Sequence, residues 1–482
     1  MGIITKELLG GENMKGRLII QREKGVTLIA LVVTITVLLI LASVTITSVF
    51  GDNGILIKAQ EAANEIKNAL EQEQAELNQM YNELASAMNN TSGGDTDPDV
   101  PVEPELPSDG SYSEAKGVNT PNLGEGMTPI KWNGSTWIET TGDDPEWYDY
   151  TNKKWANATT SDGSMWVWIP RYAYSIMSGY NTSTAGTIKV EFMKGTSNET
   201  STGRTNFDNA SGQGNWNIHP AFEYGSTVSG IWVAKFEASS VEGNKNSSSG
   251  DNVTSKTLQV KPNVSSWRYI TLENMYTVCE NYNKSLNSHL IKNDEWGAVA
   301  YLSKSKYGKE TEEIGLNTSV DFITGSVGDK YTPTISDYTS EEGVKASTTG
   351  TIWGIYDMRG GAAEYIAAYV DNGHSMLTKY GESMINGEEK KKNVYDTGTS
   401  DSQYKNYGES KSKYGDALYE TSTTVSAWYE DLSEFPYISY PFFKRGGSAD
   451  WEDEKTGIFA YTIANGDWYE EVSFRPVLIV EL

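Results

Sequence analysis

The sequence predicts an α+β protein in which a long amino-terminal α-helix precedes an irregular domain of short strands and two helices. Three observations lead to this prediction. Residues 26–50 carry no charged side chain, and a helical pattern resumes after them and continues to residue 88. Residues 89–122 are rich in Ser, Gly, Pro, Asp and Glu. The remainder, 123–482, alternates short apolar stretches with turns rich in Gly, Trp and Tyr, which is typical of a loop-rich folded domain.

The amino-terminal apolar stretch is long enough to cross a lipid bilayer. Residues 26–50 are 25 uncharged residues, and a helix rises ~1.5 Å per residue. Lys15, Arg17, Arg22 and Lys24 lie shortly before the stretch. The positive-inside rule therefore keeps the start of the chain cytoplasmic and places the rest outside. We expect a single-pass protein of the cell membrane with an extracellular carboxy-terminal domain.

The junction "KGVTLIALVV", with Gly25 before the apolar run, resembles a type IV prepilin leader. The resemblance implies that residues 1–25 are a leader peptide, which a prepilin peptidase removes between Gly25 and Val26. It also implies other pilin subunits as partners in a surface filament. Many pilins carry glutamate at the fifth mature position, where this chain has Ala30, which favours a minor pilin or a simple anchor. An ordinary single-span anchor that is never cut is the alternative.

A second helical pattern follows the turn sequence "GDNG". Four residues recur every seven positions: Ala63, Leu70, Leu77 and Leu84. Glu73 interrupts this stripe, which indicates either packing against neighbouring subunits or a stalk helix. We interpret residues 26–88 as one transmembrane and stalk helix. Residues 89–122 are too polar to bury a core, and we interpret them as an acidic spacer.

Several short stretches define the outer domain. "MWVWIPRYAY" (165–174) and "GIWVAKFEAS" (230–239) alternate bulky and branched residues as strands do. "TLENMYTVCENYN" (271–283) predicts a helix whose buried face includes Cys279. "HLIKNDEWGAVAYLSKSKYG" (289–308) predicts a turn and a second helix, and "IKWNGSTWIE" (130–139) an added strand pair.

Five motifs in order, "GIWVAKFEAS", "HLIKNDEW", "GIYDMRGGAAEY", "RGGSADW" and "SFRPV", resemble the formylglycine-generating-enzyme-like family, a branch of the C-type lectin fold. The resemblance implies a C-type-lectin-like domain over 123–482. Adjacent glycines permit a close backbone approach, and each arginine can reach a buried carboxylate or loop carbonyls. Glu364 is a candidate partner for one arginine. The expected scaffold residues are Arg445, Gly446, Gly447 and Arg475.

Two stretches between "RGGS" and the end, "ADWEDEKT" and "TIANGDWYEE", combine aromatic and polar residues and lack the aliphatics of a core. Such a composition is typical of binding surfaces. The expected ligand-binding residues are Trp451, Glu452, Asp453, Asn465, Asp467, Trp468, Tyr469 and Glu470. Their placement resembles that of the variable proteins of diversity-generating retroelements, which implies a protein or glycan ligand. The alternative is that both tryptophans fill the core of the domain.

Composition excludes several other functions. A formal charge of −26 argues against nucleic acid as a partner. The family's oxidising enzymes hold copper with a cysteine pair near the carboxyl terminus, whereas Cys279 is the only cysteine, and three scattered histidines form no metal-site spacing. We therefore expect no enzyme, no cofactor and no metal site, although acidic loops leave a structural calcium open. A surface-displayed adhesin or receptor is the predicted function, and a minor pilin with a structural role in filament assembly is the alternative.

Overall fold

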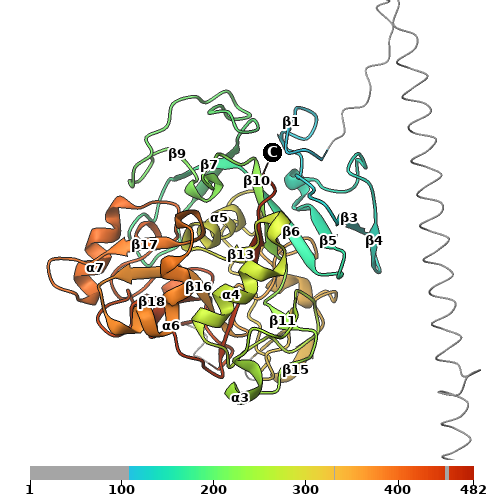
Figure 1. The fold of residues 1–482 in the computed structure, drawn as a ribbon. Coiled ribbons are helices and arrows are strands. Elements are labelled where there is room, and N and C mark those ends of the chain that lie inside the picture. The colour runs from blue at the N-terminus through green and yellow to red at the C-terminus, as the bar shows by residue number, and fades with distance from the viewer. Residues whose placement is uncertain (1–107, 330–331, 451–454, 482) are drawn as a thin grey trace, which may run out of the picture. The chain divides into compact units, whose positions relative to one another are not determined.

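Two large β-sheets and five short α-helices form the framework of the part of the chain that the structure describes (Figure 1). The computed structural model describes residues 108–329, 332–450 and 455–481. All of these residues belong to the second of the chain's two units, residues 102–482.

The larger sheet has seven strands in the order β13-β21-β10-β6-β5-β3-β4, and every neighbouring pair is antiparallel. Its strands are β13 (His289–Leu290), β21 (Pro476–Leu478), β10 (Gly230–Ala234), β6 (Met165–Pro170), β5 (Asn157–Thr160), β3 (Met127–Trp132) and β4 (Trp137–Glu139). Trp168 of β6 lies opposite Trp232 of β10, with ring centroids 5.2 Å apart. The central strands are buried along their whole length because both faces of the sheet are covered.

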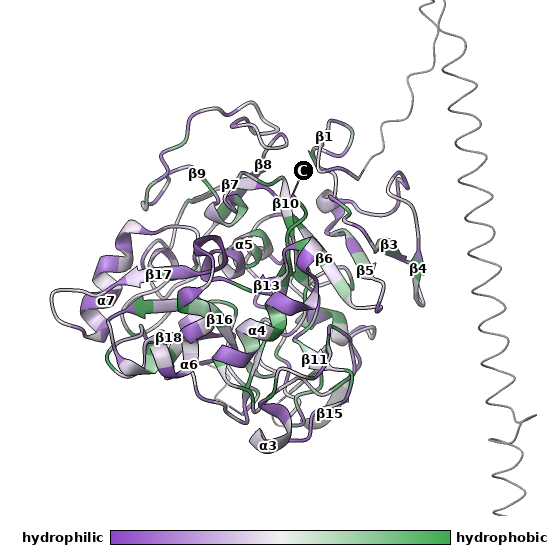
Figure 2. Cartoon of the chain, viewed as in Figure 1, coloured by the Kyte–Doolittle hydropathy of each residue, from purple (hydrophilic) through white to green (hydrophobic). Residues whose placement is uncertain are grey.

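The second sheet is mixed. Its strands are β17 (Asn393–Asp396), β16 (Ala363–Asp371), β18 (Phe442–Arg445), β19 (Tyr461–Ala464) and β20 (Val472–Phe474). Strand β16 pairs with β18 in antiparallel fashion and with β17 and β20 in parallel. Hydrophobic residues run along β10 in Figure 2, and all residues of β16 except the last are buried.

The remaining strands form four smaller sheets. A three-stranded sheet joins β8 (Ile188–Phe192), β7 (Tyr172–Ile176) and β9 (Asn217–Ile218). Three ribbons of two strands pair β1 (Tyr112–Ser113) with β2 (Val118–Asn119), β11 (Ser239–Ser240) with β12 (Leu258–Gln259), and β14 (Val327–Asp329) with β15 (Thr332–Ser336).

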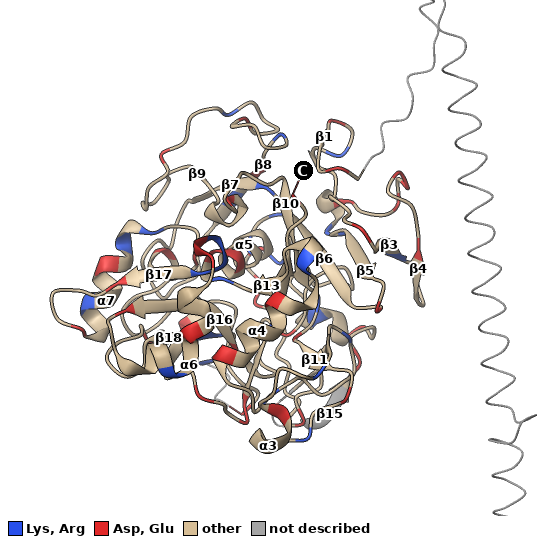
Figure 3. Cartoon of the chain, in the orientation of Figure 1, with Lys and Arg blue, Asp and Glu red and all other residues tan. Residues whose placement is uncertain are grey.

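The helices are short and lie beside the sheets. They are α3 (Ser248–Asp251), α4 (Leu272–Tyr282), α5 (Asn293–Ser303), α6 (Ser375–Asn386) and α7 (Gln403–Glu409). Helix α4 buries Leu272, Met275, Tyr276 and Cys279, as the helical spacing predicts. Helix α5 is buried along its whole length. Figure 3 shows charged residues on the outer surfaces of α4, α6 and α7.

The predicted fold class is wrong. The described residues are richer in strand (26%) than in helix (20%) and contain five short α-helices, whereas the sequence predicts a domain with two helices. The extra helices escape prediction because each buries few apolar side chains; α6, for example, buries only Leu377, Gly381 and Met384. The predicted long helix over 26–88 lies outside the described residues.

The predicted boundary of the spacer needs a second correction. Residues 108–122, assigned to the spacer, are described and form part of the folded unit. Val118 and Asn119 are fully buried, and the Trp232 indole N–H donates to the Asn122 carbonyl over 2.7 Å. The Asn119 side-chain amide donates to the Ser229 carbonyl over 2.9 Å. Val118 belongs to the hydrophobic core, but hydrogen bonds satisfy the polar groups of the rest of this segment, so its polar composition gives little sign of burial.

No helix within the described ranges combines the length and the apolar character that crossing a membrane requires. The predicted span over 26–50 and the leader over 1–25 lie outside those ranges.

Candidate functional site

The loop of residues 465–471 joins β19 to β20 and carries five of the predicted ligand-binding residues. These are Asn465, Asp467, Trp468, Tyr469 and Glu470. The backbone N–H groups of Tyr269, Leu272 and Ala363 donate to carbonyl oxygens of this loop over 2.9–3.1 Å. Two neighbouring segments, 269–272 and the start of β16, thus fix the loop backbone.

Trp468 is the most prominent side chain of the loop. It is 40% exposed, and its ring stacks on Tyr269 with centroids 5.8 Å apart and planes inclined by 30°. Tyr269 has a left-handed backbone, with φ of 58°, which non-glycine residues rarely adopt. Such backbone conformations persist only where neighbouring structure enforces them, and they are concentrated at functional sites.

Arg268 and Glu470 flank this stacked pair. The Arg268 guanidinium lies 5.6 Å from the centroid of the Tyr269 ring, and its Nη1 donates to the Glu470 carbonyl over 2.6 Å. Burial raises the pKa of Tyr269, and the carboxylate of Glu470 beside its hydroxyl raises it further. Glu470 itself is exposed, so a negative charge borders the exposed indole.

Tyr469 is partly buried next to Trp468. Its hydroxyl donates to the Asn465 side-chain oxygen over 2.9 Å. The Lys444 ammonium lies 5.2 Å from the centroid of the Tyr469 ring, and burial lowers the pKa of Lys444. The ring is therefore held between an amide and a cation, which restricts its rotation.

Asp467 and Asn465 hold the loop together rather than face outward. Oδ2 of Asp467 accepts a hydrogen bond of 2.6 Å from the Tyr380 hydroxyl, and Oδ1 accepts the backbone N–H of Trp468 over 2.9 Å. Between them, Gly466 has φ of 88°, and a Cβ there would lie 2.6 Å from Cβ of Tyr380. Only glycine fits this position.

Tyr440 extends the aromatic surface. It is 41% exposed, in the segment between β17 and β18 that also exposes Ile438. Burial is the main cause that raises the pKa of Tyr469, and the carboxylates of Asp467 and Glu471 and then the hydroxyls of Tyr440 and Tyr380 add to it. We call the set Tyr269, Tyr380, Tyr440, Trp468 and Tyr469 the aromatic face.

Sequence reasoning missed three members of the aromatic face: Tyr269, Tyr380 and Tyr440. One signal was available for Tyr440, because "FPYISYP" (435–441) places two prolines around it and so argues for an exposed loop. Nothing in the sequence brings Tyr269 or Tyr380 next to the loop, since both come from distant segments.

The scaffold beneath the face is a buried ion pair. Arg475 contacts Glu364 through two hydrogen bonds, Nε to Oε2 over 3.1 Å and Nη2 to Oε1 over 2.6 Å, and both side chains are fully buried. Arg475 also donates to the carbonyls of Ala234 and Tyr356 over 2.8 and 2.9 Å. One guanidinium thus joins β20, β16 and β10, and so fixes the strand that follows the loop.

The "RGGS" segment is equally constrained. Arg445 is fully buried, donates to the carbonyls of Ala417 and Ile458 over 3.3 and 3.4 Å, and has its pKa lowered to about 10 by burial. Gly446 and Gly447 have φ of 80° and 75°, and a Cβ on Gly447 would lie 2.8 Å from Cα of Thr456. These contacts hold the backbone at the end of β18.

The remaining predicted residues lie outside the described part of the chain. Trp451, Glu452 and Asp453 follow "RGGSAD" in the sequence, and Gly25 and Val26 form the predicted processing site. Of the described residues just before Trp451, Ala449 is buried and Asp450 is exposed.

The groups that could ligate a metal are dispersed. Cys279 and His289 are buried, and burial raises the pKa of the Cys279 thiol. His289 contacts Glu295 over 2.9 Å, His219 lies against Tyr172, and His374 caps α6. Within the described ranges, no three His, Cys, Asp or Glu side chains form a group that could hold a metal ion.

Comparisons with known proteins identify no family. The chain matches no protein-family model, and no curated protein is significantly similar to it.

Proposed function

We propose that the chain is a surface-displayed adhesin or receptor whose aromatic face binds a protein or glycan. In this proposal residues 26–50 anchor the chain in the membrane, and the folded unit lies outside the cell. The observation that carries the proposal is the exposure of Trp468 and Tyr440 on a surface whose backbone is hydrogen-bonded in place.

The aromatic face has the physical properties of a binding surface. Tryptophan and tyrosine offer large contact areas and lose little conformational entropy on binding. Stacking on Tyr269 already orders the Trp468 ring, so little more entropy is lost when a partner covers it. The exposed Glu470 supplies a negative charge at the edge of the face, where it can select among partners.

The motifs that resemble the formylglycine-generating-enzyme-like family also support this proposal. Glu364 of "GIYDMRGGAAEY" pairs with Arg475 of "SFRPV", and the Trp296 indole of "HLIKNDEW" lies against Arg445 of "RGGS". These motifs thus pack against one another in a core that supports the final loops. A binding role through these loops is what the resemblance to variable proteins of diversity-generating retroelements implies.

Two experiments test the proposal. Protease treatment of intact cells should remove the folded unit if it is displayed outside, and leave it intact if it is cytoplasmic. The purified full-length chain in detergent should bind members of an array of glycans and extracellular proteins, whereas a chain that binds none of them would contradict the proposal for these ligand classes.

A minor pilin is the second candidate, favoured by the prepilin-like junction at Gly25. Mass spectrometry of the chain from cells then gives Val26 as the first residue. If the role is structural, a chain that lacks residues 123–482 should still support piliation. If the folded unit is the binding domain, cells that carry this shortened chain should lose surface binding.

A further inference from the structure

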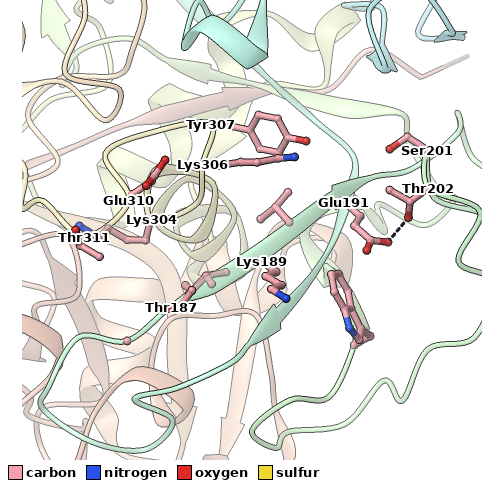
Figure 4. A pocket seen from close by; sticks show the side chains of 14 residues that line it. Thr187, Lys189, Glu191, Ser201, Thr202, Lys304, Lys306, Tyr307, Glu310 and Thr311 are labelled. Carbon is pink, nitrogen blue, oxygen red and sulfur yellow. Dashed lines mark hydrogen bonds between the residues drawn. The ribbon is translucent and has the colours of Figure 1, made fainter.

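A pocket of about 410 Å³ lies beside the three-stranded sheet (Figure 4). Strand β8 forms one wall, with Lys189 and Glu191, and the chain that follows α5 forms another, with Lys306 and Tyr307. Its size is suitable for a small molecule. None of the residues that line it belongs to the aromatic face.

Two aromatic rings of the pocket are held in place by neighbours. The Trp216 ring lies 3.9 Å from the Arg204 guanidinium, and the Tyr307 ring lies 4.5 Å from that of Phe192. Arg204 in turn makes two hydrogen bonds to Glu191, over 3.0 and 3.1 Å. The rings therefore offer preformed flat surfaces to a ligand.

The charges of the pocket favour an anion. Three lysines line it, Lys189, Lys304 and Lys306; Lys189 and Lys306 are exposed, and within the described residues none of the three makes an ion pair. The Glu191 carboxylate is already neutralised by Arg204 and accepts a hydrogen bond of 2.7 Å from Thr202 (Figure 4). Glu310 is the one other acidic residue of the lining, so positive charge is in excess here although the chain carries −26.

Lys304 is the buried member of the three. It is 3% exposed, its ammonium lies 4.4 Å from the centroid of the Tyr429 ring, and it donates a hydrogen bond to the Glu312 carbonyl. Burial lowers the pKa of Lys304 to about 7. Its ammonium is thus held by Tyr429 and Glu312, neither of which lines the pocket.

We infer that this pocket binds a small organic acid, a carboxylate carried on a ring. The ring lies against Trp216 and Tyr307, and the carboxylate pairs with the exposed ammonium groups of Lys189 and Lys306. Uronic-acid sugars and aromatic acids share this chemistry. The inference is independent of the aromatic face.

Calorimetric titration of the full-length chain with four probes tests this inference. The acids are galacturonate and benzoate, and their uncharged counterparts are galactose and benzyl alcohol. We expect at least one acid to bind about tenfold more tightly than its uncharged counterpart. If galacturonate binds more tightly than benzoate, the ligand is a uronic-acid sugar, and if benzoate binds more tightly, the ligand is an aromatic acid. Equal affinity within both pairs would overturn the inference.

Variants locate the binding. Lys189→Gln/Lys306→Gln should weaken binding of the acid at least about fivefold, and Trp216→Ala by a similar factor, whereas Lys284→Gln, an exposed lysine outside the pocket, should bind like the parent. An unchanged affinity in the double variant would contradict the site, and so would loss of binding in Trp468→Ala.

Discussion

Trp468 stacks on Tyr269, and this contact joins the final loop of the sheet to the segment that leads into α4. The stack leaves 40% of the Trp468 side chain exposed while its position is fixed. An exposed ring held in one orientation contributes little to folding and is available to a partner. Stability measurements can separate these two roles.

Trp468→Ala should lower the free energy of unfolding by less than about 1 kcal/mol, because much of the ring is already in water. Trp428→Ala is the matched control, since Trp428 is fully buried and its indole donates to the Gly179 carbonyl over 2.8 Å. We expect the control substitution to lower the free energy of unfolding by about 3–5 kcal/mol. Urea denaturation gives both values, and similar losses in the two variants would show that Trp468 belongs to the core.

Glu364→Gln should destabilise the folded unit by about 3–5 kcal/mol, because the buried Arg475 guanidinium loses its counter-charge. The control variant Glu342→Gln breaks an exposed ion pair with Lys345 and should lower the free energy of unfolding by less than about 1 kcal/mol. Denaturant titration of both variants checks the difference. A Glu364→Gln variant as stable as the parent would mean that Arg475 needs no carboxylate.

Gly447→Ala should be more damaging than Gly126→Ala. Both glycines have φ near 75°, where alanine is strained by about 1 kcal/mol, but a Cβ on Gly126 meets no atom within 4 Å. A Cβ on Gly447 would lie 2.8 Å from Cα of Thr456, and this clash should lower the free energy of unfolding by about a further 1–3 kcal/mol. Equal thermal midpoints for the two variants would contradict a close backbone approach at "RGGS".

Glu420 gives the folded unit a dependence on pH. Burial raises the pKa of Glu420 to about 7, and its Oε2 accepts hydrogen bonds from the Tyr174 hydroxyl and the Gly415 N–H, each of 2.7 Å. Because the folded pKa is higher than the unfolded one, this group's contribution is full below about pH 4.5 and is lost as the pH rises through 7. Glu420→Gln mimics the protonated form, so its free energy of unfolding should fall less than the parent's between pH 5 and 8. Identical slopes would show that Glu420 does not titrate in this range.

The sequence identifies the local elements better than their assembly. Alternation and helical spacing predict β6, β10 and α4, because each has a regular set of buried side chains. The strand pair of β3 and β4 is also predicted, and "NGST" (133–136) supplies its turn. The two sheets are not predicted, since the partners of β16 come from segments far apart in the chain.

For the candidate site, too, the sequence predicts local features but not tertiary contacts. Composition alone selects Trp468, Tyr469 and Glu470 as residues of a surface loop. It does not distinguish them from Asn465 and Asp467, whose hydrogen bonds to Tyr469 and Tyr380 are tertiary contacts. Tyr269 has a left-handed backbone and Tyr380 lies on α6, and no local pattern marks either one as part of a surface.

The most direct test of the aromatic face is the affinity of the full-length chain for the array member that binds it best. The parent, the Trp468→Ala/Tyr440→Ala variant and the control Val320→Ala, which alters an exposed side chain outside the face, are compared by biolayer interferometry. We predict at least about a tenfold loss of affinity for the double variant, with an unchanged thermal midpoint, and no loss for the control. Equal affinities for the parent and a folded double variant would contradict a binding role for this face.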